Sequence, residues 1–317
     1  MRLKQVSTVI SALAVATLFE LVGVAKQADA ASIQLFGLTD NNALVDFNSN
    51  NPNRSRMIGV TGITGTLLGI DFRPANGLLY GLTDTNNIYT IDTTTGAATL
   101  VSTLSIPFTG GLMSGVDFNP TPDRLRVVGS NEQNLRINVD NGVTLVDSPL
   151  AYAPGDANFG QDPNITAAAY TNSFAPSPDP TRRTTLYEID SALDILVTQG
   201  SVNFLAGDPA PAVSPNTGQL FTVGSLGIDF GATGGLDIFS PRSGVNSAFA
   251  ASGSTLYTID LNTGSATTVG RIGNGNVNIV GLAAARSVPE PGTIGALIGL
   301  GAFTLIGWHR RPVKSEN

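Results

Sequence analysis

Short runs of alternating apolar and polar residues, separated by turn residues, recur along most of the chain. The clearest series occupies residues 67–106, where four such runs lie at 69–74, 78–82, 88–92 and 97–101. Alternation with a period of two indicates half-buried β-strands, and Gly, Asn and Thr between the runs indicate tight turns. The series therefore predicts one antiparallel sheet of four strands.

Copies of this series indicate a repeat. Gly-Ile-Asp-Phe at 69–72 returns 46 residues later as Gly-Val-Asp-Phe at 115–118, and Leu-Tyr-Thr-Ile-Asp at 256–260 copies 88–92. A repeat of roughly 40–50 residues with four strands is typical of a propeller blade. We predict an all-β fold, a β-propeller with five blades. Six blades are the alternative, and an open β-solenoid is the structural rival.

The two ends of the repeat region complement each other. Residues 279–285 match the first strand of the series but no further strands follow them, whereas the unit at 35–61 lacks its first strand. Pairing of strand 279–285 with the N-terminal blade would close the ring and leave no long sheet edge exposed.

The N-terminus has the composition of a secretory signal peptide over residues 1–30. Two basic residues precede an apolar segment, and Ala28 and Ala30 form an A-x-A cleavage site. A membrane anchor or buried helix is the alternative. We expect a mature domain at 31–287 and a separate tail at 288–317, with helices at both ends of the precursor.

The tail consists of Pro289, Glu290 and Pro291, an apolar run at 293–308 and a basic end. This arrangement resembles the PEP-CTERM sorting tail of exported proteins from exopolysaccharide-producing bacteria. The resemblance implies processing near Pro-Glu-Pro by an exosortase-type membrane enzyme after export. The domain would then be released or attached at the cell surface. A permanent transmembrane anchor is the alternative, and the basic end fits the positive-inside rule.

The body also resembles an exported, propeller-like family known only as a domain of unknown function. The stretches that carry this resemblance span nearly the whole of 35–285, among them 69–74, 124–128, 155–158, 168–172 and 186–199. The resemblance implies a fold, and no activity or catalytic residue comes with it.

Composition narrows the possible functions. The chain has no Cys, and its one His is His309 in the tail, so the body holds neither a Ser-His-Asp triad nor a His-ligated zinc site. Residues 31–287 contain twenty acidic residues, eleven Arg and no Lys. An acidic body without a basic cluster argues against nucleic acid as a partner.

The loop at 151–164 interrupts the repeat and is the first candidate for a site. Asp156, Asn158 and Asp162 offer oxygen ligands for Ca²⁺, with Asn164 nearby, although the spacing is not that of an EF-hand. The alternatives are that the same residues contact a polar ligand, or that this is an Asx-turn loop that covers one end of the propeller. No other cofactor is expected.

Three arginines on neighbouring predicted strands are the second candidate. Arg124, Arg126 and Arg136 would bind the carboxylates of acidic sugars through bidentate contacts. The alternative is pairing with Asp117, Asp123 or Asp140. The repeated acids Asp71 and Asp117 occupy equivalent points in two blades, and such equivalence argues against an acid–base pair, whose members need different environments.

These observations favour an exported, non-catalytic module at the cell surface or in the extracellular matrix. It would bind exopolysaccharide or a surface protein, or act structurally. A glycoside-active enzyme that uses two carboxylates is one alternative, and a calcium-stabilised scaffold is another.

Overall fold

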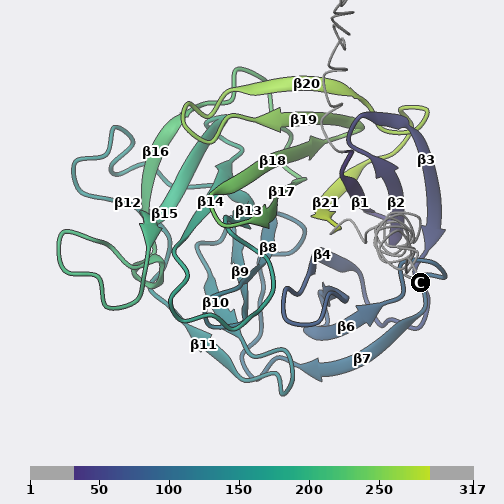
Figure 1. The fold of residues 1–317 in the computed structure, drawn as a ribbon, viewed down its shortest axis with the longest axis horizontal. Coiled ribbons are helices and arrows are strands. Elements are labelled where there is room, and N and C mark those ends of the chain that lie inside the picture. Colours follow the sequence, from purple (N-terminus) through teal and green to yellow (C-terminus); the bar gives the residue numbers. More distant parts are fainter. Residues whose placement is uncertain (1–31, 286–317) are drawn as a thin grey trace, which may run out of the picture. The chain divides into compact units, whose positions relative to one another are not determined.

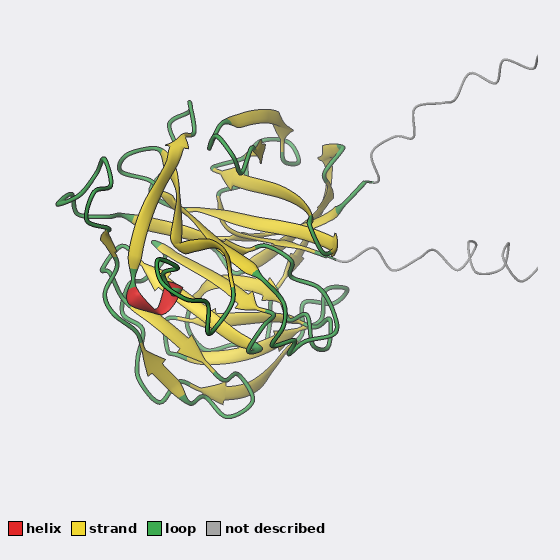
Figure 2. Cartoon of the chain, turned by 60° about the vertical axis from the view of Figure 1, so that its left-hand side comes forward, coloured by secondary structure: helices red, strands yellow, loops and turns green. Residues whose placement is uncertain are grey.

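Five β-sheets surround a common axis in the computed structural model, which describes residues 32–285 (Figure 1). The five innermost strands contact one another in a closed cycle in the order β4, β8, β13, β17 and β21. This arrangement is a five-bladed β-propeller and confirms the predicted fold class and blade number. Figure 2 shows that strands make up nearly all of the regular structure, with one short 3₁₀ helix, η1 (Pro215–Thr217), in the described part.

Each blade is numbered here by its place in the chain, and its strands are given from the axis outwards. Blade 1 contains β21 (Ile279–Ala284), β1 (Gln34–Thr39), β2 (Ala43–Asn48) and β3 (Asn51–Gly59). Blade 2 contains β4 (Leu67–Phe72), β5 (Leu79–Thr83), β6 (Asn87–Ile91) and β7 (Ala98–Thr103). Blade 3 contains β8 (Ser114–Asn119), β9 (Arg124–Gly129), β10 (Asn134–Ile137) and β11 (Thr144–Val146).

Blades 4 and 5 complete the circle. Blade 4 contains β13 (Ile165–Tyr170), β14 (Thr184–Asp190), β15 (Ile195–Phe204), β16 (Gln219–Ser225) and β12 (Ala151–Tyr152). Blade 5 contains β17 (Gly234–Arg242), β18 (Val245–Ser252), β19 (Thr255–Ile259) and β20 (Ala266–Arg271).

The ring closes through blade 1, as the sequence predicted. Strand β21 supplies the innermost strand and pairs antiparallel with β1, with Leu35 opposite Ala284 and Phe36 opposite Ala283. The first and the last described strands of the chain are thus hydrogen-bonded neighbours, and blade 1 has no free inner edge.

Small residues allow the inner strands to meet at the axis. One residue of each inner strand reaches the same level, and these residues are Gly69, Gly115, Ala167, Gly235 and Gly281. A methyl group on Gly115 would lie 2.5 Å from Cβ of Ala168, and one on Gly69 would lie 2.5 Å from Cγ2 of Val116. The space left between the strands is about 10 Å³, roughly the volume that one water needs. The axis is therefore closed at this level.

The hydrophobic core lies between blades rather than in one central mass. Five separate clusters of buried side chains occur, one at each contact between neighbouring blades. Between blades 2 and 3, for example, Leu82 and Ile88 pack against Phe118 and Val127. Alternation along each strand sends successive side chains to opposite faces, so every blade contributes to two of these clusters.

Some expectations from the sequence differ from the structure or lie outside it. The loop at 151–164 begins with β12, which pairs parallel to β16 and adds a fifth strand to blade 4. Residues 227–230 copy the opening phrase in sequence but form no strand. The signal peptide with Ala28 and Ala30, the tail with Pro289, Glu290 and Pro291, and the expected terminal helices lie outside the described residues. Within residues 32–285, no helix is long and apolar enough to span a membrane.

The closed axis generates a stability prediction. Gly115→Ala should lower the melting temperature by an amount equivalent to about 1–3 kcal/mol, because the added methyl overlaps the backbone of β13. Gly59→Ala is the matched control, since nothing lies within 4 Å of its added methyl. Thermal unfolding of the two variants checks this. Equal melting temperatures would show that the inner strands have room to separate.

Candidate ligand-binding site

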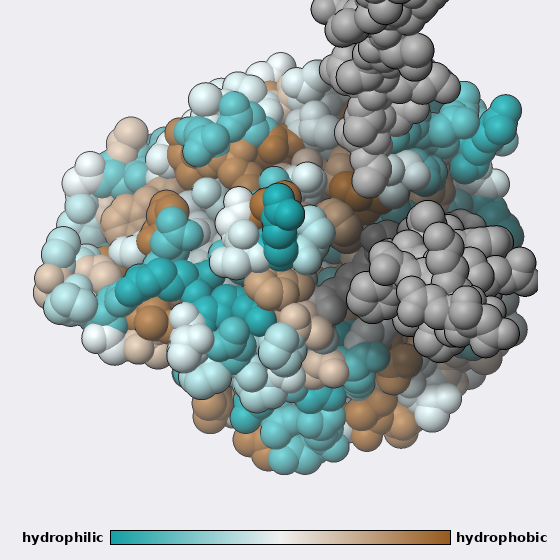
Figure 3. Space-filling view, viewed as in Figure 1, coloured by the Kyte–Doolittle hydropathy of each residue, from teal (hydrophilic) through white to brown (hydrophobic). Residues whose placement is uncertain are grey.

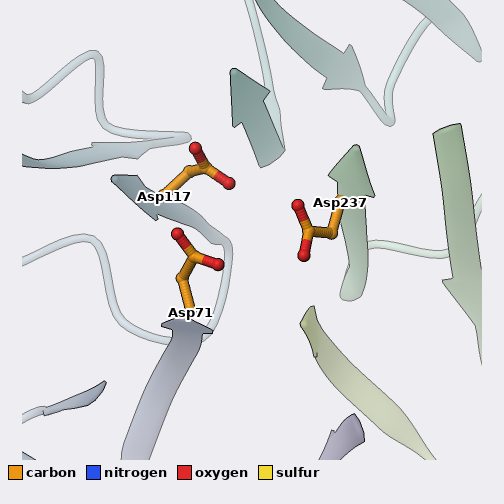
Figure 4. Close-up of side chains that lie close together, drawn as sticks. All are labelled: Asp71, Asp117 and Asp237. Carbon is orange, nitrogen blue, oxygen red and sulfur yellow. The ribbon is translucent and has the colours of Figure 1, made fainter. Parts of the chain in front are cut away.

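Three aspartates converge on the axis just beyond the ring of small residues. Asp71 on β4, Asp117 on β8 and Asp237 on β17 each follow the axial glycine of their strand by two positions. One carboxylate oxygen from each lies within 4.8 Å of the other two, and all three side chains are buried. Figure 4 shows the three carboxylates pointing toward one another from three different blades. We call Asp71, Asp117 and Asp237 the aspartate trio.

Each member of the trio accepts a hydrogen bond from the next inner strand. Asp71 Oδ2 accepts from the N–H of Phe118 at 2.7 Å, and Asp117 Oδ1 accepts from that of Tyr170 at 3.0 Å. Asp237 Oδ2 accepts in the same way from the N–H of Ala284 at 2.5 Å. Because these N–H groups belong to neighbouring blades, the carboxylates join blade 2 to 3, blade 3 to 4 and blade 5 to 1.

The remaining two blades place alanine at the equivalent position. Tyr170 and Ala284, which donate to the trio, directly follow Ala169 of β13 and Ala283 of β21. The ring at this level therefore reads Asp, Asp, Ala, Asp, Ala. The two alanines lie on either side of Asp237 in the ring, so the three carboxyl groups come from blades 2, 3 and 5.

Burial and mutual repulsion shift the protonation of the trio. Burial raises the pKa of Asp71 well above its usual value, and the Asp237 charge raises it further, against the hydrogen bonds from Phe118 and Phe72. Burial, followed by the charges of Asp71 and Asp237, raises the pKa of Asp117 in the same way. Burial raises the pKa of Asp237 to about 6, although Ala284 and Ile238 donate to its carboxylate. Burial and mutual repulsion therefore both disfavour simultaneous ionisation of all three carboxyl groups.

A pocket of about 900 Å³ opens above the trio between blades 1, 2 and 5. Asp71 and Asp237 belong to its floor. Aromatic rings from three inner or near-inner strands form part of the wall, and polar side chains form the rest; these residues are Phe36, Phe72, Phe239, Gln34, Asn48, Asn76 and Ser240. A concave site of this size, at the axis of the fold, is where a ligand site is expected. We call it the axial pocket.

The two arginines of the axial pocket are already paired. Arg56 donates to Asp46 at 3.1 Å at the rim. Arg73, which is 8% exposed, donates to Asp123 at 2.6 Å and to Asp140 at 2.6 Å and 2.9 Å. Hydrogen bonds to these two carboxylates raise the pKa of Arg73. The ion pairs of Arg73 with Asp123 and Asp140 also tie the end of β4 to two turns of blade 3.

The three arginines of the predicted patch already have hydrogen-bond partners within the protein, and binding of a ligand by them stays a prediction. Arg126 is 1% exposed and donates to Asp147 at 2.6 Å, and Arg136 donates to the same carboxylate at 2.6 Å and 2.8 Å. Arg124 donates instead to the carbonyls of Pro122 and Asp123. Two of the three therefore share one acid, Asp147, which is not among the partners that the sequence suggested. The strand alternation gave no sign that Arg126 would face the interior between blades 3 and 4.

The loop at 151–164 packs onto the outer part of blade 4. Asp156 accepts from the N–H of Thr222 at 2.7 Å, from its hydroxyl at 2.8 Å and from the N–H of Asn158 at 2.9 Å. Asn158 donates to the same hydroxyl at 2.9 Å. Asp162 lies beside Glu132, whose pKa is raised by burial and by this neighbouring acid. The structure thus brings Asp156 and Asn158 together at Thr222, and calcium binding by the set with Asp162 stays a prediction.

One further acid is buried between blades 3 and 4. Glu188 on β14 is fully buried, and neither of its carboxylate oxygens has a hydrogen-bond partner in the described part of the chain. Burial raises its pKa from 4.5 to about 8, against the opposing effect of the Arg126 charge. Glu188 is therefore neutral at pH 7 in the folded protein and charged in the unfolded chain.

The raised pKa of Glu188 makes the stability of the protein depend on pH. Because the folded pKa of Glu188 is raised, the unfolded chain loses its proton first, and stability falls as pH rises from about 4.5 to about 8. Each pKa unit corresponds to about 1.4 kcal/mol. Glu188→Gln should therefore raise the melting temperature at pH 7–8 and have little effect near pH 4.5. Melting curves of the wild type and of Glu188→Gln between pH 4.5 and 8 check this prediction. A difference in melting temperature that does not vary with pH would contradict it.

The sequence suggested neither the trio nor the axial pocket as a site. Asp71 and Asp117 were recognised as repeats, but Asp237 follows Gly-Gly-Leu rather than the Gly-Ile or Gly-Val of the other two copies. The available signal was an Asp two residues after a glycine in three of the five inner strands. This signal indicates a site only once the ring geometry shows that the inner strands meet at the axis.

Comparison with known proteins gives the chain two matches along its length. Residues 43–283 match the family described as "Domain of unknown function (DUF4394)", and residues 287–311 match the PEP-CTERM protein-sorting motif. Both agree with the resemblances seen in the sequence. None of the curated proteins compared matches the chain.

The chain also matches solved structures. One is a structural genomics protein of unknown function from Bacteroides thetaiotaomicron VPI-5482, with 16% sequence identity and a TM-score of 0.43. The match covers 80% of this chain and 65% of the other, so the chain spans less than two thirds of that protein.

Proposed function

The chain belongs to the DUF4394 family and carries a PEP-CTERM sorting motif, and we propose that it is an exported, non-catalytic binding module whose ligand is a polysaccharide. The sorting motif marks the chain as exported and as a substrate of exosortase-type machinery. The proposed location is the cell surface or the extracellular matrix, where the protein would meet exopolysaccharide.

The axial pocket is the observation that carries this proposal. Its volume of about 900 Å³ suits a short stretch of a sugar chain rather than a single small ion. Phe72 and Phe239 are partly exposed at its wall. Aromatic faces supply large contact areas for apolar C–H groups, such as those on the faces of sugar rings. The amides and hydroxyls around them offer hydrogen bonds to sugar hydroxyls.

The polarity of the described surface on one face of the molecule is mixed. On the face shown in Figure 3, hydrophilic and hydrophobic residues alternate among the described residues. A mixed surface of this kind favours a hydroxyl-rich partner over a broad apolar protein interface.

Binding of oligosaccharides to the full-length protein tests the proposal. Phe72→Ala should weaken binding about tenfold or more, equivalent to about 1.4 kcal/mol, because it removes one wall of the pocket. Phe159→Ala is the matched control, since Phe159 is 62% exposed on the loop at 151–164 and does not line the pocket. Isothermal titration calorimetry against a panel of neutral, acidic and amino oligosaccharides measures both. If no member of the panel binds, or if both variants bind alike, the proposal is wrong.

A second candidate function is favoured by the acids at the pocket floor. Two carboxyl groups about 5–5.5 Å apart are the arrangement of a retaining glycosidase, and Asp71 and Asp237 lie close together below the pocket. Their equivalent hydrogen bonds to the next inner strand argue against separate acid and base roles. Release of reducing ends from any bound oligosaccharide, lost in Asp237→Asn, would favour the enzyme over the binding module.

A further inference from the structure

The axial pocket extends from the axis of the propeller toward the rim, between blades 1 and 2. At the axis it is lined by Ala284 of β21 and Asp237 of β17, both on innermost strands. At the rim it is lined by Arg56 of β3, the outermost strand of blade 1, and by Thr94 in the turn after β6. Three strand spacings separate β21 from β3, which is about 14 Å. The pocket therefore has an inner end at the axis and an outer end at the rim.

The inner end of the pocket is closed below and on one side. Below it, the ring of small residues leaves a space of about 10 Å³ between the inner strands, roughly the volume that one water needs. On the side of blades 3 and 4 lies the connection between β13 and β14, residues 171–183. Ser173 of this connection lines the pocket, and no other residue of blades 3 and 4 does so in the described part of the chain.

The connection at 171–183 is fixed to the blades on both sides of it. Ser177 donates to the carbonyl of Pro120 in blade 3 at 2.8 Å. The N–H of Gly244 in blade 5 donates to Oδ1 of Asn172, also at 2.8 Å. Arg182, which is 6% exposed, donates to three carbonyls of the same connection. A polymer that enters the pocket therefore has no exit at the inner end.

The charged side chains that line the pocket all have partners within the protein. Arg56 pairs with Asp46, and Arg73 pairs with two acids of blade 3. Both oxygens of Asp71 and of Asp237 accept backbone N–H groups, and burial of these two acids disfavours their charged forms and raises their pKa. The pocket thus offers no free cation to a uronic acid and no fixed anion to an amino sugar. A neutral sugar suits it better than either.

We propose that the axial pocket binds the end of a neutral glycan chain, with the terminal sugar at the axis and the rest of the chain leaving past Arg56 and Thr94. This inference rests on the proposed function and specifies which part of the polymer is bound. A segment from the middle of a chain needs an exit at both ends of the pocket, and the closed inner end provides none.

The dependence of binding on chain length tests the inference. Maltohexaose, cellohexaose, mannohexaose and N-acetylated chitohexaose are titrated by calorimetry into the full-length protein in a non-ionic detergent, and each one that binds is followed by its long polymer. One protein molecule should bind per chain at both lengths. A number bound per chain that rises with length, or binding of acidic or amino oligosaccharides alone, overturns the inference and leaves glycan binding intact. Absence of binding to every oligosaccharide, charged or neutral, contradicts the proposed function as well.

Modified chain ends give a second test. Each hexasaccharide that binds is prepared with its reducing sugar opened by borohydride, and separately with a methyl ether on O4 of its non-reducing sugar. One of the two changes should weaken binding about tenfold or more, because the altered sugar lies at the closed inner end. The other should have little effect, because that sugar lies at the open end. Equal effects of the two changes, or no effect of either, would overturn the inference.

Two variants distinguish the ends of the pocket. Ala285, directly after β21, lines the inner end, and Ala285→Trp should weaken the binding of disaccharides and hexasaccharides alike by about tenfold or more. Thr94→Trp, at the outer end, should weaken hexasaccharides and leave disaccharides unchanged. Asn262 occupies the equivalent position in the matching turn of blade 5 and does not line the pocket, so Asn262→Trp is the control and should change neither.

Melting temperatures of these variants show whether each one folds. If Ala285→Trp does not fold, Ser173→Trp fills the inner end from the opposite wall and should have the same effect on binding. Disaccharides that bind a folded inner-end variant as they bind the wild type would overturn the inference.

Discussion

The close approach of five inner strands at the axis governs the rest of the molecule. Glycine or alanine at this level lets backbones meet where a larger side chain would overlap the neighbouring strand, so the axis is closed. A closed axis converts what would be a channel into a one-ended pocket. Residues that follow the small residues by two positions are brought together, and one carboxylate oxygen each of Asp71, Asp117 and Asp237 lies within 4.8 Å of the other two.

Apolar and polar contacts hold the blades in different ways. Every pair of neighbouring blades shares a hydrophobic cluster, which supplies stability without fixing the relative height of the strands. Directional hydrogen bonds fix that height at three of the five contacts through the trio. At the contact between blades 2 and 3, Arg73 adds a second link through Asp123 and Asp140. The contact between blades 3 and 4 adds Arg126, which reaches Tyr170 and Asn216 as well as Asp147.

Local patterns were sufficient to predict the fold. Alternation with a period of two located most strands, and the orphan strand at 279–285 predicted the closure of the ring, because both signals are read from neighbouring residues. The site depends on contacts between residues far apart in the chain. Asp71 and Asp237 lie three blades apart in the sequence, and only the ring places them in one pocket. The burial of Arg126 could not be predicted from the sequence either, because its partners Asp147 and Asn216 come from different blades.

The pairing of β1 with β21 has a consequence for the order of events during export. If the chain crosses the membrane from its N-terminus, β1 emerges early and waits for a partner that is almost the last part of the propeller to follow. Closing so long a loop costs little extra free energy, because the entropy grows only with the logarithm of its length. The delay instead leaves one unsatisfied strand edge exposed, a site at which chains can aggregate. The sorting motif begins at residue 287, directly after β21. Cleavage at that motif would therefore act beside the strand whose arrival completes the fold.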